Sequence, residues 1–443
     1  GPGELVTRLP SALAMAAAAA AVAALGRRLV SPRAGLAAGL LFAALPQVSL
    51  YAQDAREYAG VAALATTGSY LLVRALADPG RRARWLTGYA ACLGLMGLLN
   101  VFSLLLLGAH AITVALAWWR GADREGGRGG IWGGRPPGAS TGRRLSLGWL
   151  AAAAGAAALA SPVLALGYAE RGTLSWLARP QVIGAVEGLR KLIGPAQMLL
   201  ALCVAIGIGI VLSALGGRAA LGGRAGLGGR AGLRAAWPGP LLSLCLPWLL
   251  IPPAVLIGVS QVSPVYTFRY VLLCAPAAAL LGGAGLAALI WPPGGALSWV
   301  PATVAFAVVV ALGVPAQFAA RAPNGHGTNI RKANAVVVAH RQPGDAVLFL
   351  GNDSNYFPAA YSSGFGRLDD IGERLTPSQA GNLVGAPFRA SVIRERLAHV
   401  RRVWVVRLGA YPQDPVPGLG FHLVRRWLIS HIWMLLFARG STG

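Results

Sequence analysis

Ionisable and aromatic side chains gather in three short segments, each at the edge of a long apolar block. They are Arg8 in RLPSALA, the run Tyr51–Tyr58 (YAQDAREY) and the run Ser263–Tyr270 (SPVYTFRY). Guanidinium groups bind phosphate with bidentate geometry, and a carboxylate such as Asp54 can accept the proton of an attacking hydroxyl. The three segments together favour a site for an anionic lipid phosphate.

A second interpretation of these segments remains open. Tyrosine and arginine are also enriched in the headgroup belts of membrane proteins, where they anchor helices without binding a substrate. Asp54 could then simply pair with Arg56, two residues further along the chain.

The elements that must position these residues are membrane-spanning helices. The 443 residues are 55% hydrophobic and only 12% charged, against roughly 25% charged in a typical soluble domain, and the mean hydropathy is +0.58. Apolar blocks of about 20 residues are long enough to cross a hydrocarbon core of roughly 30 Å. We therefore predict an α-helical polytopic membrane protein with about ten spans, near 9–27, 33–50, 56–76, 85–99, 101–119, 145–167, 195–215, 239–259, 269–290 and 298–318.

The distribution of positive charge predicts the sidedness of the chain. If the chain begins outside, the inside loops hold 17 cations and the outside segments of the membrane part hold 7, as the positive-inside bias requires. We expect a multi-pass protein of the plasma membrane, with a membrane domain over 1–318 and an extracytoplasmic soluble domain over 319–443. The net charge of +24 does not indicate a nucleic-acid partner, because the arginines lie between apolar blocks rather than on one patch.

Several other features predict structure rather than chemistry. The loops 120–144 and 216–234 are of low complexity and are expected to be flexible linkers. The four cysteines lie in apolar blocks and are expected to be small core residues, and the histidines lack metal-ligand spacing, with His110 expected at a helix contact. Asp369-Asp370 is predicted to be a solvated turn, so no metal site is expected.

The C-terminal 125 residues alternate helical and strand patterns. We predict helices over 327–341 and 389–399, strands over 345–351 and 402–408, and a hairpin over 420–438, which together indicate a small α/β domain. The polar and aromatic loop 352–371 could contact a sugar or acceptor, but an irregular connection is the favoured interpretation.

Three stretches resemble the polytopic C-type glycosyltransferases, specifically bacterial relatives of the dolichyl-phosphate-mannose protein mannosyltransferases. They are RLPSALA (8–14), SPRAGLAAGLLFAALPQVSLYAQDAREYA (31–59) and SPVYTFRYVLLCAPAAALLGGAGL (263–286). The resemblance implies an inverting transfer of a sugar, a mannose-type hexose or a pentose, from a polyprenyl-phosphate donor. The acceptor would be an extracytoplasmic hydroxyl of a glycan, lipid or protein, with membrane lipid around the site.

The resemblance also implies roles for particular residues. The donor phosphate would be bound by the residues that match the family's motifs, namely Arg8, Arg56, Tyr58, Arg269 and Tyr270. The family's base is an acidic residue in a first outer loop that would precede RLPSALA, so we expect an N-terminally truncated sequence with eleven spans in full length. Glu4 lies too close to the span to be that acid, and Asp54 is the candidate carboxylate within the chain.

Some functional questions stay open at this point. The sequence assigns no cofactor and leaves open whether a divalent cation assists. The alternatives to a glycosyltransferase are a secondary transporter, which would need internal repeats and broken helices near the midplane, and an inactive structural membrane protein that lacks the catalytic first outer loop.

Overall fold

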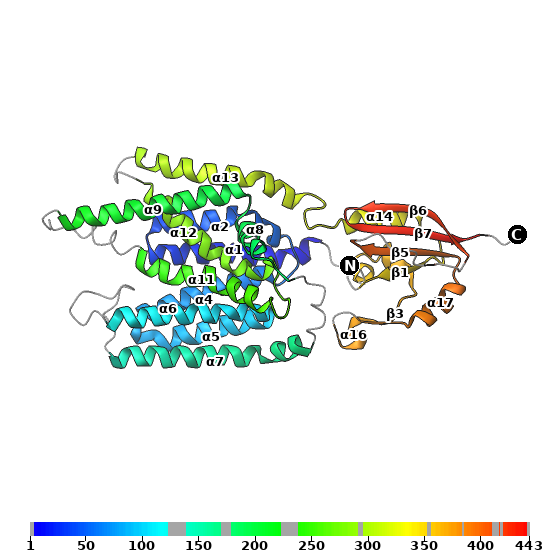
Figure 1. Ribbon diagram of the computed structural model, residues 1–443, viewed down its shortest axis with the longest axis horizontal. Coiled ribbons are helices and arrows are strands. Elements are labelled where there is room, and N and C mark those ends of the chain that lie inside the picture. The colour runs from blue at the N-terminus through cyan, green and yellow to red at the C-terminus, as the bar shows by residue number, and fades with distance from the viewer. Residues whose placement is uncertain are drawn as a thin grey trace. The chain divides into compact units, whose positions relative to one another are not determined.

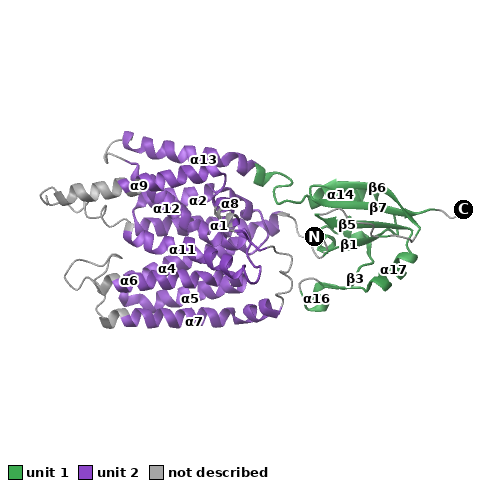
Figure 2. Cartoon of the chain, in the orientation of Figure 1, with its two compact units in different colours: residues 1–3, 319–443 green, residues 4–318 purple. Residues whose placement is uncertain are grey.

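The computed structural model describes residues 4–122, 139–169, 179–222, 238–290, 296–351, 356–382, 385–409, 416 and 420–440. The chain separates into two compact units (Figure 2), residues 4–318 and residues 319–443 together with residues 1–3. The first unit is helical and the second is built around a β-sheet. Each unit has its own hydrophobic core.

The first unit is a bundle of long helices (Figure 1). Its α-helices are α1 (Glu4–Leu29), α2 (Pro32–Ala44), α3 (Pro46–Ala52), α4 (Tyr58–Ala77), α5 (Arg82–Leu99), α6 (Leu105–Ala122), α7 (Ala139–Ala169), α8 (Val182–Ile193), α9 (Ala196–Gly222), α11 (Pro238–Val259), α12 (Ala275–Ala288) and α13 (Val300–Arg321). Its 3₁₀ segments are η1 (Pro79–Arg81), η2 (Val101–Leu104), η4 (Phe268–Cys274) and η5 (Ala296–Trp299).

Each of the ten predicted spans coincides with a helix or a pair of helices. Among the described residues, 7 helices are long and apolar enough to cross a membrane, and the bent pair α2 and α3 brings the number to 8. The other two predicted spans, α5 and α9, are not among these 8. α5 has two arginines in its first turn, and the apolar part of α9, Ala196–Ile208, is shorter than a full span. The predicted polytopic helical fold is confirmed.

The second predicted span is interrupted near its C-terminal end. α2 and α3 meet at an angle of 62° because Leu45, between them, is extended (φ −64°, ψ 130°) and Pro46 occupies the first turn of α3. A proline cannot continue the preceding helix but is well suited to start a new one. The break ends the span with a separate short helix, which leads into the turn 53–57.

Among the candidate spans of the described residues, Phe268–Ala288, which contains η4 and α12, is the most buried, with 89% of its apolar window inside the structure. α12 forms most of this span. It consists almost entirely of alanine, glycine and leucine, so neighbouring backbones can approach closely. Gly283 lies against the backbone of Ala38 in α2, and Gly285 lies against Ala205 and Ile206 in α9. Small residues at helix contacts allow this kind of packing in membranes, and α12 therefore holds the preceding segment η4 in a defined place.

A buried polar network joins four helices in the middle of the bundle. The two ring nitrogens of His110 lie 3.1 Å from Ser69 Oγ and 3.0 Å from the hydroxyl of Tyr89. The indole N–H of Trp149 donates to the same hydroxyl at 3.2 Å. The predicted helix contact of His110 is therefore confirmed, and it links α4, α5, α6 and α7.

The second unit contains a five-stranded sheet of order β2-β1-β5-β7-β6. α14 packs with the core residues of one sheet face, and Leu397 of α17 packs with those of the other. A separate two-stranded sheet pairs β3 with β4. The elements are α14 (Ile330–His340), β1 (Ala346–Leu350), α15 (Phe357–Ala360), η6 (Phe365–Arg367), β2 (Asp369–Asp370), β3 (Glu373–Leu375), α16 (Pro377–Ala380), β4 (Ala386–Pro387), α17 (Ala390–Ala398), β5 (Arg402–Leu408), β6 (Phe421–Ile429) and β7 (Ile432–Arg439).

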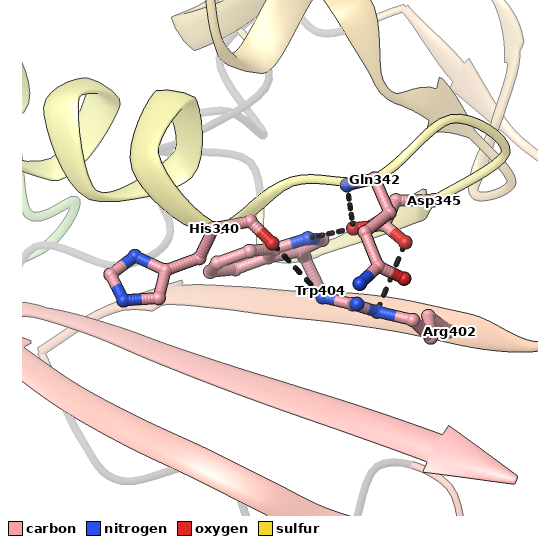
Figure 3. A network of polar contacts seen from close by, with 5 residues as sticks. All are labelled: His340, Gln342, Asp345, Arg402 and Trp404. Carbon is pink, nitrogen blue, oxygen red and sulfur yellow. Dashed lines mark hydrogen bonds and ion pairs between the residues drawn. The ribbon is translucent and has the colours of Figure 1, made fainter.

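A buried carboxylate ties the end of α14 to the sheet (Figure 3). Asp345 is only 3% exposed and accepts hydrogen bonds from the indole N–H of Trp404 at 2.9 Å and from the backbone N–H of Gln342 at 3.0 Å. Its other oxygen lies 3.2 Å from Nε of Arg402. Arg402 also donates to the carbonyl of His340 at 3.0 Å, so this network holds the α14–β1 turn in place.

Three predictions about local structure need correction. Asp369 and Asp370 form β2, parallel to β1, instead of a solvated turn, because the carboxylate of Asp370 is satisfied by the backbone N–H groups of Gly372 and Glu373. Residues 120–122, 139–144 and 216–222, predicted to be flexible, continue helices, because a helix that has already formed can extend by one hydrogen bond per residue. Cys203 is exposed on its helix, since a small apolar thiol also suits a surface that faces lipid.

The rest of the two low-complexity loops, 123–138 and 223–237, lies outside the described residues. So do residues 352–355 of the polar and aromatic loop 352–371. Phe357 and Phe365 of that loop are fully buried in the core of the second unit. Packing therefore explains part of the aromatic content of the loop.

Candidate functional site

Three segments that are far apart in the sequence meet at one end of the helical unit. They are the turn between α3 and α4, the 3₁₀ segment η4 before α12, and η2 before α6. η4 packs against α4 and against η2. The chain thus brings two of the three predicted clusters, 51–58 and 263–270, to the same place.

Aromatic rings of the three segments contact one another at this end of the bundle. The ring centroids of Tyr51 and Tyr58 are 5.3 Å apart with edge-to-face geometry, and those of Tyr58 and Tyr270 are 6.4 Å apart. Tyr270 also stacks on Phe102 of η2 at 4.7 Å. Tyr51 and Tyr58 are buried and Tyr270 is half-buried, so the rings are held in fixed positions by the surrounding helices.

Two arginines converge on these tyrosines. The charges of Arg56 and Arg269 both lie within electrostatic range of the hydroxyls of Tyr51, Tyr58 and Tyr270. The Arg56 side chain is 49% exposed and Arg269 is half-buried. Two cations beside phenolic hydroxyls can bind one anionic group through charge-assisted hydrogen bonds.

Two carboxylates lie beside the arginines in different surroundings. Asp54 is paired with Arg56, its Oδ2 atom 3.7 Å from Nε of the arginine. Glu57 accepts a weak hydrogen bond from the side-chain amide of Asn100 at 3.4 Å, and its charge acts on Tyr58 and Tyr270. Both carboxylates are half-buried, and only the charge of Glu57 acts on tyrosines of both segments.

The orientation of α1 places Arg8 at the same end of the bundle. It lies half-buried in the second turn of α1, and α1 packs against α3 and α4. The far end of α1 approaches the start of α2, where Gly26 lies against Gly35. The start of α1 therefore lies at the end of the bundle where α3 ends and α4 begins.

The helix α8 borders the cluster on a further side. The ammonium group of Lys191 lies 5.5 Å from the ring centroid of Phe268, the residue before Arg269. The hydroxyl of Tyr266 lies against Gly188, and the backbone N–H groups of Val265 and Tyr266 donate to Ser260 Oγ at 3.1 and 2.8 Å. Burial raises the pKa of the Tyr266 phenol, so this hydroxyl stays protonated near neutral pH.

The sequence patterns missed four members of this arrangement. Glu57 was part of the YAQDAREY motif but had no assigned role, and Lys191 was counted only as a positive charge. Asn100 and Phe102 carry no signal of their own, because a single amide or aromatic residue between two apolar blocks is common. Only their contacts with Glu57 and Tyr270 connect them to the site.

The described residues offer no cluster of three or more histidine, cysteine or acidic side chains that could hold a metal ion. The groups around the tyrosines are cations with two carboxylates, a composition that suits an anionic ligand. Chemically, the arrangement can bind a phosphate, orient it with fixed phenol groups and offer a carboxylate to a nearby proton.

Comparisons with known proteins agree with this description. Residues 1–124 match the family model described as dolichyl-phosphate-mannose-protein mannosyltransferase. The sequence has no significant match among curated proteins. The fold is similar to the crystal structure of ArnT from Cupriavidus metallidurans in the apo state, with a TM-score of 0.61 and 13% identity over 97% of this chain and 83% of that one. A structure of the same protein bound to undecaprenyl phosphate aligns with a TM-score of 0.59 and 13% identity over 98% of this chain and 84% of that one.

The family match supports the resemblance of two of the three sequence stretches, 8–14 and 31–59, which lie within residues 1–124. The chain shares its fold with ArnT, and its first 124 residues match the mannosyltransferase family model. It is a membrane protein with several spans and a C-terminal unit that contains a β-sheet.

Proposed function

We propose that this chain is a membrane glycosyltransferase that moves a sugar from a polyprenyl-phosphate donor to an acceptor hydroxyl. The family match over residues 1–124 and the fold shared with ArnT support this class of activity. That ArnT has been crystallised with undecaprenyl phosphate supports a polyprenyl phosphate as the carrier. The observation that carries the proposal is the contact of the Tyr58 and Tyr270 rings, whose centroids lie 6.4 Å apart. It joins the two segments that carry Arg56 and Arg269.

In this proposal the site binds the phosphate of the donor. Arg269 and Arg56 neutralise its charge, Tyr58 and Tyr270 orient it through their hydroxyls, and Arg8 adds positive charge from α1. A half-buried position strengthens these interactions because less water screens them. The greatest benefit comes late in the reaction, when the leaving phosphate carries an additional negative charge.

The transfer itself is a single displacement. The acceptor oxygen attacks the anomeric carbon, the bond between that carbon and the phosphate oxygen breaks, and the phosphate leaves on its lipid. The acceptor hydroxyl gives its proton to a base, and the configuration at the anomeric carbon inverts. Asp54 is our candidate for a carboxylate near this step, and Glu57 is a second candidate because it lies nearer to Tyr58 and Tyr270.

The finer specificity follows the family resemblance. We propose a mannose-type hexose or a pentose as the sugar, and a glycan, lipid or protein on the extracytoplasmic side as the acceptor. The match to a mannosyltransferase family supports a hexose.

Substitution of Arg269 tests the phosphate-binding role. In membranes that contain the full-length protein, Arg269→Ala should reduce transfer of radiolabelled sugar from a polyprenyl-phosphate donor by about tenfold to a hundredfold, because it removes hydrogen bonds between charged groups. Arg269→Lys should lie in between, since it keeps the charge and loses the bidentate geometry. Arg179→Ala, which removes an exposed arginine, is the matched control and should transfer sugar normally. Normal transfer by Arg269→Ala would exclude the proposed role.

The two carboxylates can be separated by the same assay. If Asp54 takes the proton, Asp54→Asn should lower the turnover at saturating donor strongly, while Glu57→Gln changes it little. The reverse order would move the role to Glu57. If both variants turn over normally, the base lies elsewhere in the full-length protein, and only the phosphate-binding role would remain.

An assay on the same membranes distinguishes a glycosyltransferase from a secondary transporter and from a structural protein. A secondary transporter would move a labelled solute across sealed vesicles without forming a glycosidic bond, and a structural protein would do neither. Incorporation of label into an acceptor, dependent on Arg269, would exclude both alternatives.

A further inference from the structure

The opposite end of the helical unit carries its own cluster of arginines, unrelated to the proposed transfer site. Arg74 lies in the last turn of α4, Arg81 ends η1, and Arg82 and Arg84 lie in the first turn of α5. Asp78 is the only acidic residue between Tyr58 and Ala122. This turn therefore holds a strong local excess of positive charge at the border of a span.

Arg74 is held in a fixed position by two aromatic rings. Its guanidinium carbon lies 4.3 Å from the ring centroid of Trp85 and 5.9 Å from that of Tyr70, and its Nη1 donates to the hydroxyl of Tyr70 at 3.1 Å. Nε of Arg74 and the indole N–H of Trp85 are both buried and have no hydrogen-bond partner among the described residues. Buried donors without an acceptor are unfavourable, so an acceptor from outside the chain would complete this arrangement.

The other charged groups of the turn do not neutralise Arg74. The carboxylate of Asp78 accepts the backbone N–H of Arg81 at 3.2 Å, and Nε of Arg82 donates to the carbonyl of Ala75 at 3.3 Å. Arg84 adds a second guanidinium beside Trp85, with its central carbon 5.8 Å from the ring centroid. In the part of the chain that the structure describes, no carboxylate is recorded in an ion pair with Arg74 or Arg84.

We propose that Arg74 and Arg84, arranged around Trp85, bind the phosphate of an anionic membrane lipid. The two guanidinium groups supply charge and donors for phosphate oxygens. Trp85 and Tyr70 are amphipathic rings of the kind that lie at headgroup level. The cluster borders the span Tyr58–Ala77, where basic residues next to a membrane helix attract anionic headgroups. This site is independent of the transfer reaction, so either proposal can fail without the other.

The same end of the bundle provides a matched control. Arg33 of α2 lies 4.8 Å from the ring centroid of Trp299, which precedes α13. This pair shares the arginine–tryptophan contact of the proposed site but lacks its second arginine and its tyrosine. Removal of Arg33 therefore removes the same charge from the same end of the protein without altering the cluster around Trp85.

Native mass spectrometry of the purified full-length protein in detergent tests the site. The probe is phosphatidylglycerol, with phosphatidylcholine as the zwitterionic lipid and inorganic phosphate as the free ion. We expect wild-type protein to bind one molecule of phosphatidylglycerol more tightly than it binds phosphatidylcholine or inorganic phosphate. Arg84→Gln should weaken that binding about fivefold, and the Arg74→Gln/Arg84→Gln double variant about twenty-five-fold, from about fivefold per arginine near a lipid surface. Arg33→Gln should bind as wild type does.

The outcomes separate the proposal from its competitors. Equal binding of phosphatidylglycerol by the wild type and the double variant would overturn the proposed site. An equal loss of binding in Arg33→Gln would also overturn it, because the lipid would then respond only to the total positive charge at this end of the bundle. Displacement of the lipid by millimolar inorganic phosphate would overturn the assignment to a lipid. Arg84 is exposed, so Arg84→Gln should fold normally and keeps the test valid if the double variant is unstable.

Discussion

Burial decides what the individual carboxylates of this chain do. Asp345 is buried but fully paired, with Arg402 on one oxygen and two N–H donors on the other, so it acts as a structural link. Asp370 is half-buried and accepts two backbone N–H groups on one oxygen. Burial raises the pKa of the Asp370 carboxyl above its ordinary value, which means that the two hydrogen bonds do not fully compensate the loss of hydration.

This shift predicts a stabilising substitution. A raised pKa in the folded state means that the folded protein binds the proton more tightly, so the charge costs stability above that pKa and costs nothing below the ordinary pKa of aspartate. Asp370→Asn keeps the oxygen that accepts from Gly372 and Glu373 and removes the charge. At pH 7 it should increase the protection of β1 and β2 from hydrogen exchange in the full-length protein, and the gain should disappear at pH 3.5.

Asp369→Asn is the control for this prediction. The Asp369 side chain is 69% exposed and lies 3.7 Å from Arg396, an exposed pair of a kind that contributes little to stability. We expect no gain in protection from that substitution at either pH. A gain equal to that of Asp370→Asn would show that charge in general, rather than burial of Asp370, is responsible.

At the scale of elements, close contacts between small residues organise the helical unit. α12 packs against α2, α9 and α11, and its glycines allow backbone-to-backbone approach at Gly283 and Gly285. The position of η4, and with it of Arg269 and Tyr270, depends on this packing because η4 leads directly into α12. The bend between α2 and α3 has a similar effect on Tyr51, which lies in the short helix beyond the break.

A methyl group added at Gly283 should therefore be costly. A Cβ atom there would meet the backbone of Ala38, and overpacking of this kind costs about 1–3 kcal/mol. Gly155→Ala places the same methyl group on α7 where nothing lies within 4 Å, and it should leave the protein unchanged or more stable by up to about 1 kcal/mol. Thermal unfolding of the two purified variants in the same detergent measures the difference. Equal melting temperatures would contradict the packing argument.

For the whole molecule, the distribution of arginine predicts how the chain lies in the membrane. The ends of the helices that carry Arg27, Arg33, Arg74 and Arg143 form one side of the helical unit, and the turn 51–58 lies at the other side. The positive-inside bias then predicts an extracytoplasmic position for the turn 51–58, and we expect the same side for the C-terminal unit.

Cysteine labelling tests this sidedness. In a background without the four native cysteines, Ser378→Cys in the exposed helix α16 should react with a membrane-impermeant maleimide in intact cells. Arg81→Cys, exposed in the turn between α4 and α5, should react only after the membrane is permeabilised. The opposite pattern would invert the orientation and place the proposed transfer site in the cytoplasm.

The sequence by itself determined the features that depend on local physics. A span must satisfy its own backbone hydrogen bonds in lipid, so its apolar block is visible in the sequence, as are the loops that carry positive charge. In the C-terminal unit, the predicted helix 327–341, the strands 345–351 and 402–408 and the hairpin 420–438 correspond to α14, β1, β5 and the pair β6 and β7. Hydrophobic runs for the strands, with helical segments between them, were sufficient to predict these elements.

Only the tertiary structure decided which side chains meet. The contacts of Tyr58 with Tyr270 and of Glu57 with Asn100 join residues from different helices, and the short strand β2 exists because Asp370 finds backbone donors and β1 as a neighbour. Lipid tails are as apolar as the helix contacts themselves, so hydropathy does not distinguish a face that packs against another helix from one that faces the membrane. The fit between specific side chains makes that choice, and it arises only when all the helices are in place.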